Sequence, residues 1–338
     1  MKCAVAIVTR LDRFQRRHPL AGFPLAVVYK YFDDFGPFLA ALIAYYGFVS
    51  LFPLLLLLST VLGFVLAGDP HLQKQVLDSA LAQFPVVGKQ LGDPRRLGGG
   101  TAGLVVGIGG SLYGGLGVAQ AVQYAMNTAW RVPRNSRPNP FKTRGRSLLL
   151  LVTAGVAVLG TTALSILGGS AAGSLGLLVK VLALAAAMAV NAAIFVFVFR
   201  VATTRSLSVR DVVPGAVAAA VIWQLLQSFG VIYVDRVVRN ASATNGVFAV
   251  VLGLIAFLYL TAAALVLCVE INVVRVDKLS PRALLTPFTD NVVLTRGDRR
   301  AYSSQAEAER SKGFEVVDVT FEQAAPQPEP PPAPDQES

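Results

Sequence analysis

Six long stretches of this chain contain no charged residue, and their length limits what the chain can fold into. A helix needs about 20 apolar residues to cross the hydrocarbon core of a bilayer. Each stretch meets or nearly meets that length. Helices of a soluble core do not need apolar stretches this long. Hydrophobic residues make up 54% of the chain and charged residues only 15%, far from the average of soluble proteins. The stretches cover residues 36–68, 97–130, 147–179, 181–199, 212–234 and 240–269.

The third stretch contains a glycine-rich segment, GGSAAGSLG at residues 168–176, which favours a turn between two helices. The sequence therefore predicts an all-α fold, a polytopic bundle of six transmembrane helices with short interfacial amphipathic helices. Residues 24–35 suit either such a helix or the first turns of the first span, and another amphipathic helix is expected after Asp69. The six spans are expected at about residues 37–66, 98–124, 147–167, 177–199, 213–234 and 246–270.

The distribution of basic residues predicts the orientation of this bundle. With six spans, the segments on the N-terminal side (1–35, 131–146, 200–211 and 275–338) carry 23 of the 30 lysines and arginines. Because basic residues concentrate in cytoplasmic loops, both termini are expected in the cytoplasm. Clustered basic residues can also neutralise nucleic-acid phosphates, but here their positions make the net charge of +10 mainly an orientation signal. We therefore expect the lipid bilayer, and no nucleic acid, as the partner.

The chain divides into three regions. Residues 1–35 form a cytoplasmic basic arm with an interfacial helix, residues 36–278 form the six-helix transmembrane domain, and residues 279–338 form a cytoplasmic tail. The tail ends in AAPQPEPPPAPDQES, whose proline and charge content cannot build a hydrophobic core. We expect that end of the tail to be disordered.

Small residues recur every four positions along the second predicted span, in the most regular pattern of the chain. Lipid gives little hydrophobic drive between helices, so close backbone approach must supply the packing, and small residues allow it. The pattern predicts a helix contact face, either within one chain or between two copies, and the oligomeric state stays open. This face consists of Gly99, Gly103, Gly107, Ser111, Gly115 and Ala119.

Four segments, taken in order, form a recognisable set. The first predicted span carries AYYGFVSLFPLL, the second ends in AVQYAMNTAWRV, the fifth contains RDVVPGAVAAAVIWQLLQSFGVIYV, and the sixth ends in LVLCVEIN. Over about residues 30–280, these motifs resemble the signature of the YihY/BrkB family of bacterial inner-membrane proteins, formerly labelled ribonuclease BN. The resemblance implies a multi-pass protein of the bacterial cytoplasmic membrane, in a family whose members are described as candidate transporters.

Two departures from the family pattern are conservative. Phe257 stands where the family usually has a tryptophan, and Cys268 with Val269 replaces the common Gly-Ala before the glutamate. These changes leave the membership intact, but they make Cys268 a poor candidate for shared chemistry.

Clusters of catalytic residues are absent from the sequence. A ribonuclease needs a general acid and base, or a metal-bound water, within reach of one phosphate. The two histidines, His18 and His71, are assigned to opposite sides of the membrane, and no phosphate-binding loop occurs. We therefore expect no enzymatic activity, no cofactor and no metal, and we set the ribonuclease label aside.

Polar side chains inside the predicted spans are the candidate functional residues. Such groups avoid lipid and face the bundle interior or a wet cavity, so each is a candidate for a transport path. Alternatively they join helices, since Asn and Gln hydrogen-bond across helices for about 1 kcal/mol each, and for any single residue this interpretation is favoured. The set consists of Tyr45, Tyr46, Asn127, Gln224, Glu270 and Asn272, with Gln120, Gln123, Asn191 and Gln227 as further members.

Glu270 ends the last apolar stretch, one turn beyond a 20-residue span, at the expected cytoplasmic interface. A carboxylate near a helix C-terminus opposes the helix dipole, so the helix is expected to continue to Arg275 or Lys278 before Pro281 stops it. We expect a structural ion pair or hydrogen-bonded clamp with another helix end, closing the cytoplasmic end of the bundle, and proton or ion coupling is the sharper alternative. The candidate partners are Arg131, Arg144, Arg146, Arg200 and Arg205.

Three functions are consistent with these features. The first is a membrane protein that transports or accommodates an amphipathic or lipid-like solute of the cell envelope. The second is a non-transporting scaffold whose basic segments and acidic, proline-rich tail recruit partners. The third, a membrane-bound ribonuclease, is disfavoured for lack of a catalytic cluster. The solute and the energy source are not encoded in any motif.

Overall fold

The structure is a computed structural model that describes residues 11–65, 100–171, 176–233, 243–289 and 292–322. These residues form helices and connecting segments and contain no strand, which confirms the predicted all-α class for this part of the chain. The helix expected after Asp69 lies outside the described residues. The elements are α2 (Pro19–Asp33), α3 (Gly36–Val65), α5 (Gly100–Ala129), a short 3-10 helix (Arg134–Ser136), α6 (Pro140–Ala171), α7 (Gly176–Val201), α8 (Val209–Tyr233), α9 (Ala243–Val276) and α10 (Arg296–Ala308).

Several helices extend beyond the apolar stretches that predicted them. α6 begins at Pro140, within the basic segment that follows α5, where proline is compatible with the first turn of a helix. α9 continues past Glu270 to Val276, so the predicted continuation of this helix is confirmed. Charged residues therefore lie on regular helix at these ends rather than in loops.

A bend of 64° separates α2 from α3. Phe35 at the bend has a φ of 56°, and Gly36 follows it. A Cβ at Gly36 would lie 2.3 Å from the ring of Tyr31, so only glycine allows the chain to turn this closely. Residues 19–33 therefore form a helix of their own rather than the first turns of α3.

α5 packs against α3, α6 and α9. Of the predicted contact face, Gly115 and Ala119 are buried, and a Cβ at Gly115 would lie 2.9 Å from Leu151 of α6. The close approach to α3 uses Gly114 instead, where a Cβ would lie 2.6 Å from the Cα of Ser50. Gly99, and the surroundings of Gly103, Gly107 and Ser111, lie outside what the structure describes, so this part of the predicted face stays a prediction.

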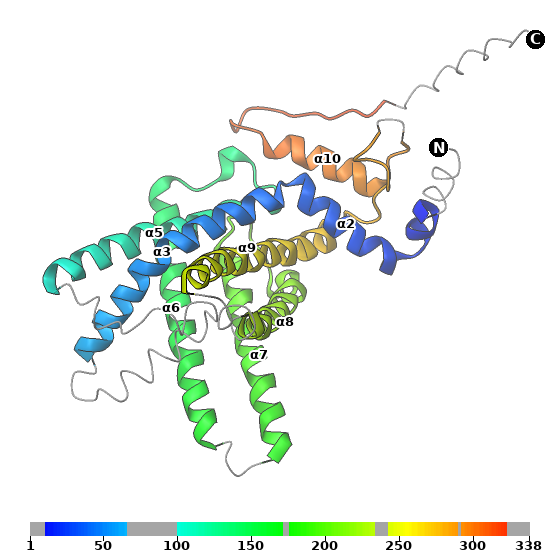
Figure 1. Ribbon diagram of the computed structural model, residues 1–338. Coiled ribbons are helices and arrows are strands. Elements are labelled where there is room, and N and C mark those ends of the chain that lie inside the picture. Colours follow the sequence, from blue (N-terminus) through cyan, green and yellow to red (C-terminus); the bar gives the residue numbers. More distant parts are fainter. Residues whose placement is uncertain (1–10, 66–99, 172–175, 234–242, 290–291, 323–338) are drawn as a thin grey trace, which may run out of the picture.

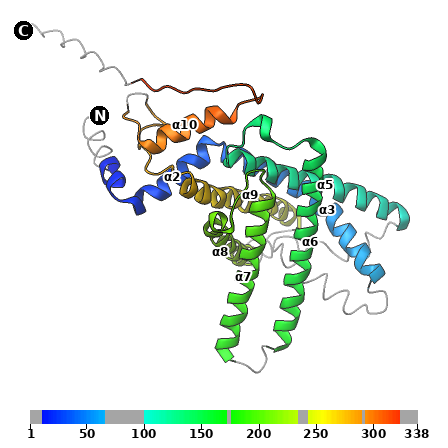
Figure 2. The same cartoon turned by 180° about the vertical axis from the view of Figure 1, so that it is seen from behind.

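α6 and α7 form a hairpin that projects away from α3, α5 and α9 in both views (Figure 1, Figure 2). Large apolar side chains are exposed along this hairpin, with exposed fractions of 61% at Val152, 65% at Val156 and 58% at Leu182. Exposed large apolar side chains of this kind suit contact with lipid rather than with water.

Two helices within the described residues are long and apolar enough to cross a membrane, Val209–Gly230 in α8 and Phe248–Val276 in α9. The bent pair Ala21–Asp33 and Gly36–Leu51 is a third if it counts as one span, and Ala185–Val201 is a shorter apolar helix. The described part is thus all-helical with helices able to cross a membrane. That the chain crosses the membrane six times, and that both termini lie in the cytoplasm, stay predictions.

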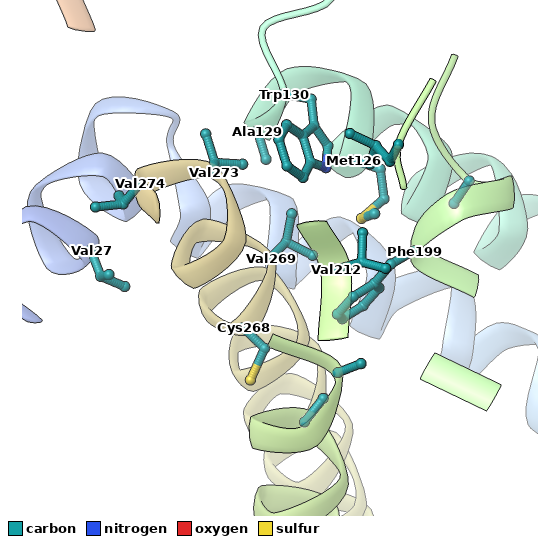
Figure 3. Close-up of a cluster of buried hydrophobic side chains, with 14 of the residues drawn as sticks. Val27, Met126, Ala129, Trp130, Phe199, Val212, Cys268, Val269, Val273 and Val274 are labelled. Atoms are coloured by element: carbon teal, nitrogen blue, oxygen red, sulfur yellow. The ribbon is translucent and has the colours of Figure 1, made fainter. Parts of the chain in front are cut away.

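The main hydrophobic core lies where α2, α5 and α9 end and the tail begins, which we call the tail-side end of the helices. Figure 3 shows Met126 and Trp130, at the end of α5, facing Val269 and Val273 of α9. Phe199 of α7 and Val212 of α8 complete the same cluster. This cluster therefore joins α2, α5, α7, α8 and α9 at their tail-side end.

The first part of the tail also folds at the tail-side end. Thr295 caps α10, since its hydroxyl accepts a hydrogen bond from the backbone N–H of Asp298 at 3.0 Å, while the Asp298 carboxylate accepts one from the backbone N–H of Thr295 at 2.8 Å. Asp298 and Ala301 are buried, and Figure 1 shows α10 at the same end of the molecule as α2. The segment predicted to be disordered, residues 323–338, lies outside the described residues.

Candidate functional site

A buried lysine on α2 forms the centre of the candidate site. The side chain of Lys30 is 0% exposed, and its ammonium group contacts three acceptors. Nζ donates to Asp34 one turn along the chain, and to the backbone oxygen of Ala129, at the end of α5, at 2.9 Å. It also lies 3.2 Å from Oε2 of Glu270 on α9. One lysine therefore joins α2, α5 and α9.

Arg131 adds a second positive charge to this cluster. It lies two residues beyond the end of α5, where its φ of 49° turns the chain away from the helix. Nη2 lies 3.5 Å from Oδ1 of Asp34, and Nη1 donates to the hydroxyl of Ser304 on α10 at 2.6 Å. We call Lys30, Asp34, Arg131 and Glu270 the charge cluster; with two positive and two negative groups it is neutral overall.

Glu270 is held less completely than its partners. Its side chain is 0% exposed, yet neither carboxylate oxygen accepts a hydrogen bond of proper geometry among the described residues. The 3.2 Å contact with Lys30 is therefore an ionic contact without hydrogen-bond geometry. A carboxylate removed from water normally needs both a counter-charge and hydrogen bonds. Glu270 has the counter-charge of Lys30 but no such hydrogen bond among the described residues.

The prediction that an arginine pairs with Glu270 was wrong, because Lys30 forms the ion pair. Arg131 belongs to the cluster but bonds to Asp34. The remaining candidates are used elsewhere or exposed: Arg146 donates to the backbone oxygen of Thr203, Arg200 to that of Leu207, Arg205 pairs with Asp277, and Arg144 is exposed. The sequence did not single out Lys30, because this residue belongs to the basic N-terminal region that was expected at the membrane surface. Its spacing of four from Asp34 within an apolar helix was the available signal.

Asn127 joins α5 to the loop between α7 and α8. Its Oδ1 accepts hydrogen bonds from the hydroxyl of Thr203 at 3.2 Å and from the backbone N–H and hydroxyl of Thr204, both at 3.0 Å. Its Nδ2 donates to the backbone oxygen of Gln123 at 2.9 Å. The amide oxygen positions this loop while the amide nitrogen bonds within α5, as expected of a residue that joins helices.

Asn272 joins α9 to the first turns of α8. Its Oδ1 accepts from the backbone N–H of Gly215 at 2.7 Å, and its Nδ2 donates to the backbone oxygen of Val212 at 3.2 Å. Pro214 lies inside α8 and has no N–H for the oxygen of Arg210, which accepts a hydrogen bond from Arg275 instead. Side chains of α9 thus replace helix hydrogen bonds near the proline.

The other three predicted residues lie apart from the charge cluster. Tyr45 is 63% exposed and contacts the ring of Tyr46 edge-on, while Tyr46 packs at Gly117 of α5. Gln224 is half-buried in the middle of α8. A void of about 10 Å³ between α5 and α9 is lined by apolar residues such as Met126, and none of the six predicted residues borders it. The six residues therefore divide into separate contacts rather than lining this void together.

A second buried network fixes the tail, and the sequence reasoning missed it. Arg282 is 1% exposed; its Nε donates to Oδ1 of Asp298 at 2.6 Å and its Nη1 to Oδ2 of Asp33 at 3.0 Å. Burial alone would lower the pKa of Arg282, but Asp33 and Asp298 raise it above its usual value, so the guanidinium stays charged. In the sequence, the capping pattern of Thr295 and Asp298 was the signal that could have indicated an ordered helix in this part of the tail.

Replacing Asp298 with asparagine is expected to loosen this part of the tail. The change removes the negative charge that faces Arg282, and hydrogen bonds to charged groups contribute about 1.5 to 3 kcal/mol. Local opening, and therefore trypsin cleavage at Arg296 and Arg299, should become at least about tenfold faster. Limited proteolysis of the purified protein measures this rate. Glu307→Gln, on the exposed side of α10, should cleave like the wild type; equal rates for both variants would contradict the role of Asp298.

These features define an all-helical protein with helices able to cross a membrane and with charged residues buried between their ends. The model of the family described as Virulence factor BrkB matches residues 27–287, which is most of the chain. The chain therefore belongs to the Virulence factor BrkB family, and the resemblance noted in its motifs is confirmed. No curated protein and no solved structure matches the chain. The matched region contains the whole charge cluster and ends before α10.

Proposed function

We propose that the protein moves or accommodates an amphipathic, lipid-like solute of the cell envelope in the bacterial cytoplasmic membrane. We further propose that the charge cluster responds to this solute. The observation that carries the proposal is the complete burial of Lys30 and Glu270, with a carboxylate that accepts no hydrogen bond among the described residues.

Stability alone gives little reason for such a pair. Removing two charges from water costs several kcal/mol per ion, and a buried ion pair is often no more stabilising than apolar residues of the same size. Ionisable residues between membrane helices instead mark pathways for solutes or protons. A pair that is only partly satisfied can exchange partners at modest cost, which suits a site that opens and closes.

The position of Lys30 supports a moving element. It lies on α2, which meets α3 at a bend of 64° near Phe35. Its partners lie on α5 and α9. Separating α2 from these helices would break the contacts of Lys30 with Ala129 and Glu270 but leave its contact with Asp34 intact, because Asp34 ends the same helix. The cluster therefore has a plausible open arrangement in which Lys30 keeps a counter-charge.

Replacing Glu270 with glutamine is expected to reduce solute movement about tenfold or more while the protein remains folded. Glutamine keeps the shape, and Lys30 retains Asp34 and the Ala129 oxygen as partners. The measurement is flux or flip of fluorescent lipids in proteoliposomes, with unfolding midpoints recorded in parallel. Glu309→Gln, at an exposed ion pair with Arg134, is the matched control and should retain the wild-type rate.

Two outcomes would count against the proposal. Wild-type protein that moves none of a panel of anionic, zwitterionic and neutral lipids would remove its basis. A Glu270→Gln protein with wild-type flux would leave transport standing but would separate it from the charge cluster.

A scaffold function is the second candidate, favoured by the segment after α10. Residues 311–322 are largely exposed, with Phe314 at 87% and Val316 at 90% exposure; a turn closed by the hydrogen bond from the Glu315 N–H to the Lys312 oxygen precedes a stretch without regular secondary structure. Exposed apolar side chains on a segment without regular secondary structure suit the binding of a partner, for example by strand addition. Because Arg282 and α10 are packed at the tail-side end, removing the entire tail would damage the fold. Deleting residues 311–338 is therefore the discriminating change: it should abolish a scaffold function and spare transport.

A further inference from the structure

A cavity of about 330 Å³ opens beside the end of α5, at the lower end of the size range of small-molecule sites. One wall is the segment that follows α5, and the other is the loop between α7 and α8. Its lining combines basic, hydroxyl and aromatic side chains, chiefly Trp130, Arg131, Pro133, Ser136, Thr204 and Arg205. We propose that this cavity binds a phosphate group.

Two buried donors in the lining residues have no acceptor among the described residues. They are Nε1 of Trp130 and Nε of Arg131, in side chains whose residues are 2% and 8% exposed. Buried N–H groups in native proteins are nearly always paired, and an unpaired one is destabilising. Both residues border the cavity, so an oxygen of a ligand bound there is a source of the missing acceptors.

The charge of the surroundings favours an anion. Residues 131–146 carry six basic residues and no acidic residue. Arg205 lies over the ring of Trp130 at 4.9 Å, and Asp277 holds it there through two hydrogen bonds of 2.7 and 3.0 Å. Asp277 offsets Arg205, Asp34 partly offsets Arg131 and Glu309 pairs with Arg134, so the excess positive charge comes from the other basic residues of the 131–146 segment.

The arrangement of donors fits a phosphate better than a carboxylate. A carboxylate presents two oxygens in one plane, whereas a phosphate presents several acceptors around a tetrahedral centre. Donors here come from both walls: Arg131, Trp130 and Ser136 from one, and from the other Arg205, whose guanidinium has N–H groups beyond the two that bind Asp277. Arginine is also the side chain best suited to bind phosphate through more than one N–H. The phosphate can belong to an anionic lipid headgroup or to a soluble phosphate compound, and binding here does not depend on the proposed transport.

Trp130 offers a direct probe of this site. The chain has two tryptophans, so Trp223→Phe leaves Trp130 as the only one. Full-length Trp223→Phe protein in a neutral detergent is titrated at constant ionic strength with inorganic phosphate in one arm. In the other arm it is titrated with phosphatidylglycerol in mixed micelles, and phosphatidylcholine serves as the comparison. We expect a saturable change in Trp130 fluorescence with phosphate, with phosphatidylglycerol, or with both.

Two variants and a matched control assign the response to the cavity. Arg131→Gln removes the unpaired donor and should weaken binding at least tenfold. Ser136→Phe fills the exposed rim of the cavity without removing charge, so it tests the site even if Arg131→Gln fails to fold. Arg144→Gln removes an exposed arginine of the same basic segment and should bind like the parent.

Each outcome decides the proposal. Saturation by phosphate indicates a soluble ligand, and saturation by phosphatidylglycerol alone indicates a lipid headgroup; both support the site. The proposal fails if neither arm gives a saturable change. It fails equally if Arg144→Gln weakens binding as much as Ser136→Phe, because the response would then come from general surface charge.

Discussion

Replacing Lys30 with methionine is expected to lower the free energy of unfolding by about 3 to 5 kcal/mol, as expected when one partner of a buried ion pair is removed. Lys30 touches Asp34, Glu270 and the Ala129 oxygen at once. Without it, two buried carboxylates face only Arg131, and the cluster carries one excess negative charge. Methionine has similar length and no charge, so packing changes little.

A second substitution tests whether charge causes this loss. Adding Glu270→Gln to Lys30→Met makes the cluster neutral again, with Asp34 facing Arg131, so the double variant should regain much of the lost stability. Denaturant unfolding in mixed micelles, analysed as a double-mutant cycle, measures the coupling. Lys142→Met, at an exposed lysine of α6, should unfold like the wild type. Additive effects of the two cluster substitutions would show that Lys30 and Glu270 do not interact.

The sequence was sufficient for the features that depend on local composition. Long apolar stretches predicted helices, and the opposition between Glu270 and the helix dipole predicted that α9 continues to the region of Arg275. Ordered motifs predicted the family. These inferences need only spacing along one helix, which a sequence contains in full.

The sequence did not predict the rotation of each helix about its axis, that is, which face of the helix points toward its neighbours. In a soluble protein, polar residues mark the outer face, but a helix in lipid is apolar on both its inner and outer faces. Ala44 is 7% exposed and its neighbour Tyr45 is 63% exposed, yet nothing in their stretch distinguishes the two faces. The candidate set accordingly mixed exposed Tyr45 with buried Glu270.

The partner of Glu270 could not be predicted from the sequence either, because it depends on the angle between α2 and α3. Lys30 lies on α2, which turns by 64° relative to α3, and from there it reaches Glu270 of α9. That turn follows from the positive φ of Phe35 and from Gly36 against Tyr31, and such contacts are tertiary. A lysine in a basic N-terminal region is reasonably assigned to the surface until the bend is known.

Replacing Gly215 with alanine is expected to prevent α8 from seating on α9 and to lower the free energy of unfolding by about 3 kcal/mol, the upper part of the usual range for overpacking. A Cβ at this position would lie 2.1 Å from the backbone oxygen of Cys268 and 2.4 Å from Nδ2 of Asn272. A helix carbonyl cannot move aside as a side-chain tip can. The two helices would have to separate, and the hydrogen bond from Gly215 to Asn272 would be lost.

Two comparisons isolate this close approach from the general effect of alanine in a helix. Gly155 lies in α6 with open space around it, so Gly155→Ala should be neutral or stabilising by up to about 1 kcal/mol. Adding Asn272→Ala to Gly215→Ala removes the side-chain clash but leaves the carbonyl of Cys268 in place, so little stability should return. Unfolding midpoints in mixed micelles and elution as a single species report both effects. Similar stability of the Gly215→Ala and Gly155→Ala proteins would mean that α8 and α9 do not lie this close, and the role of Asn272 as their connection would fail with it.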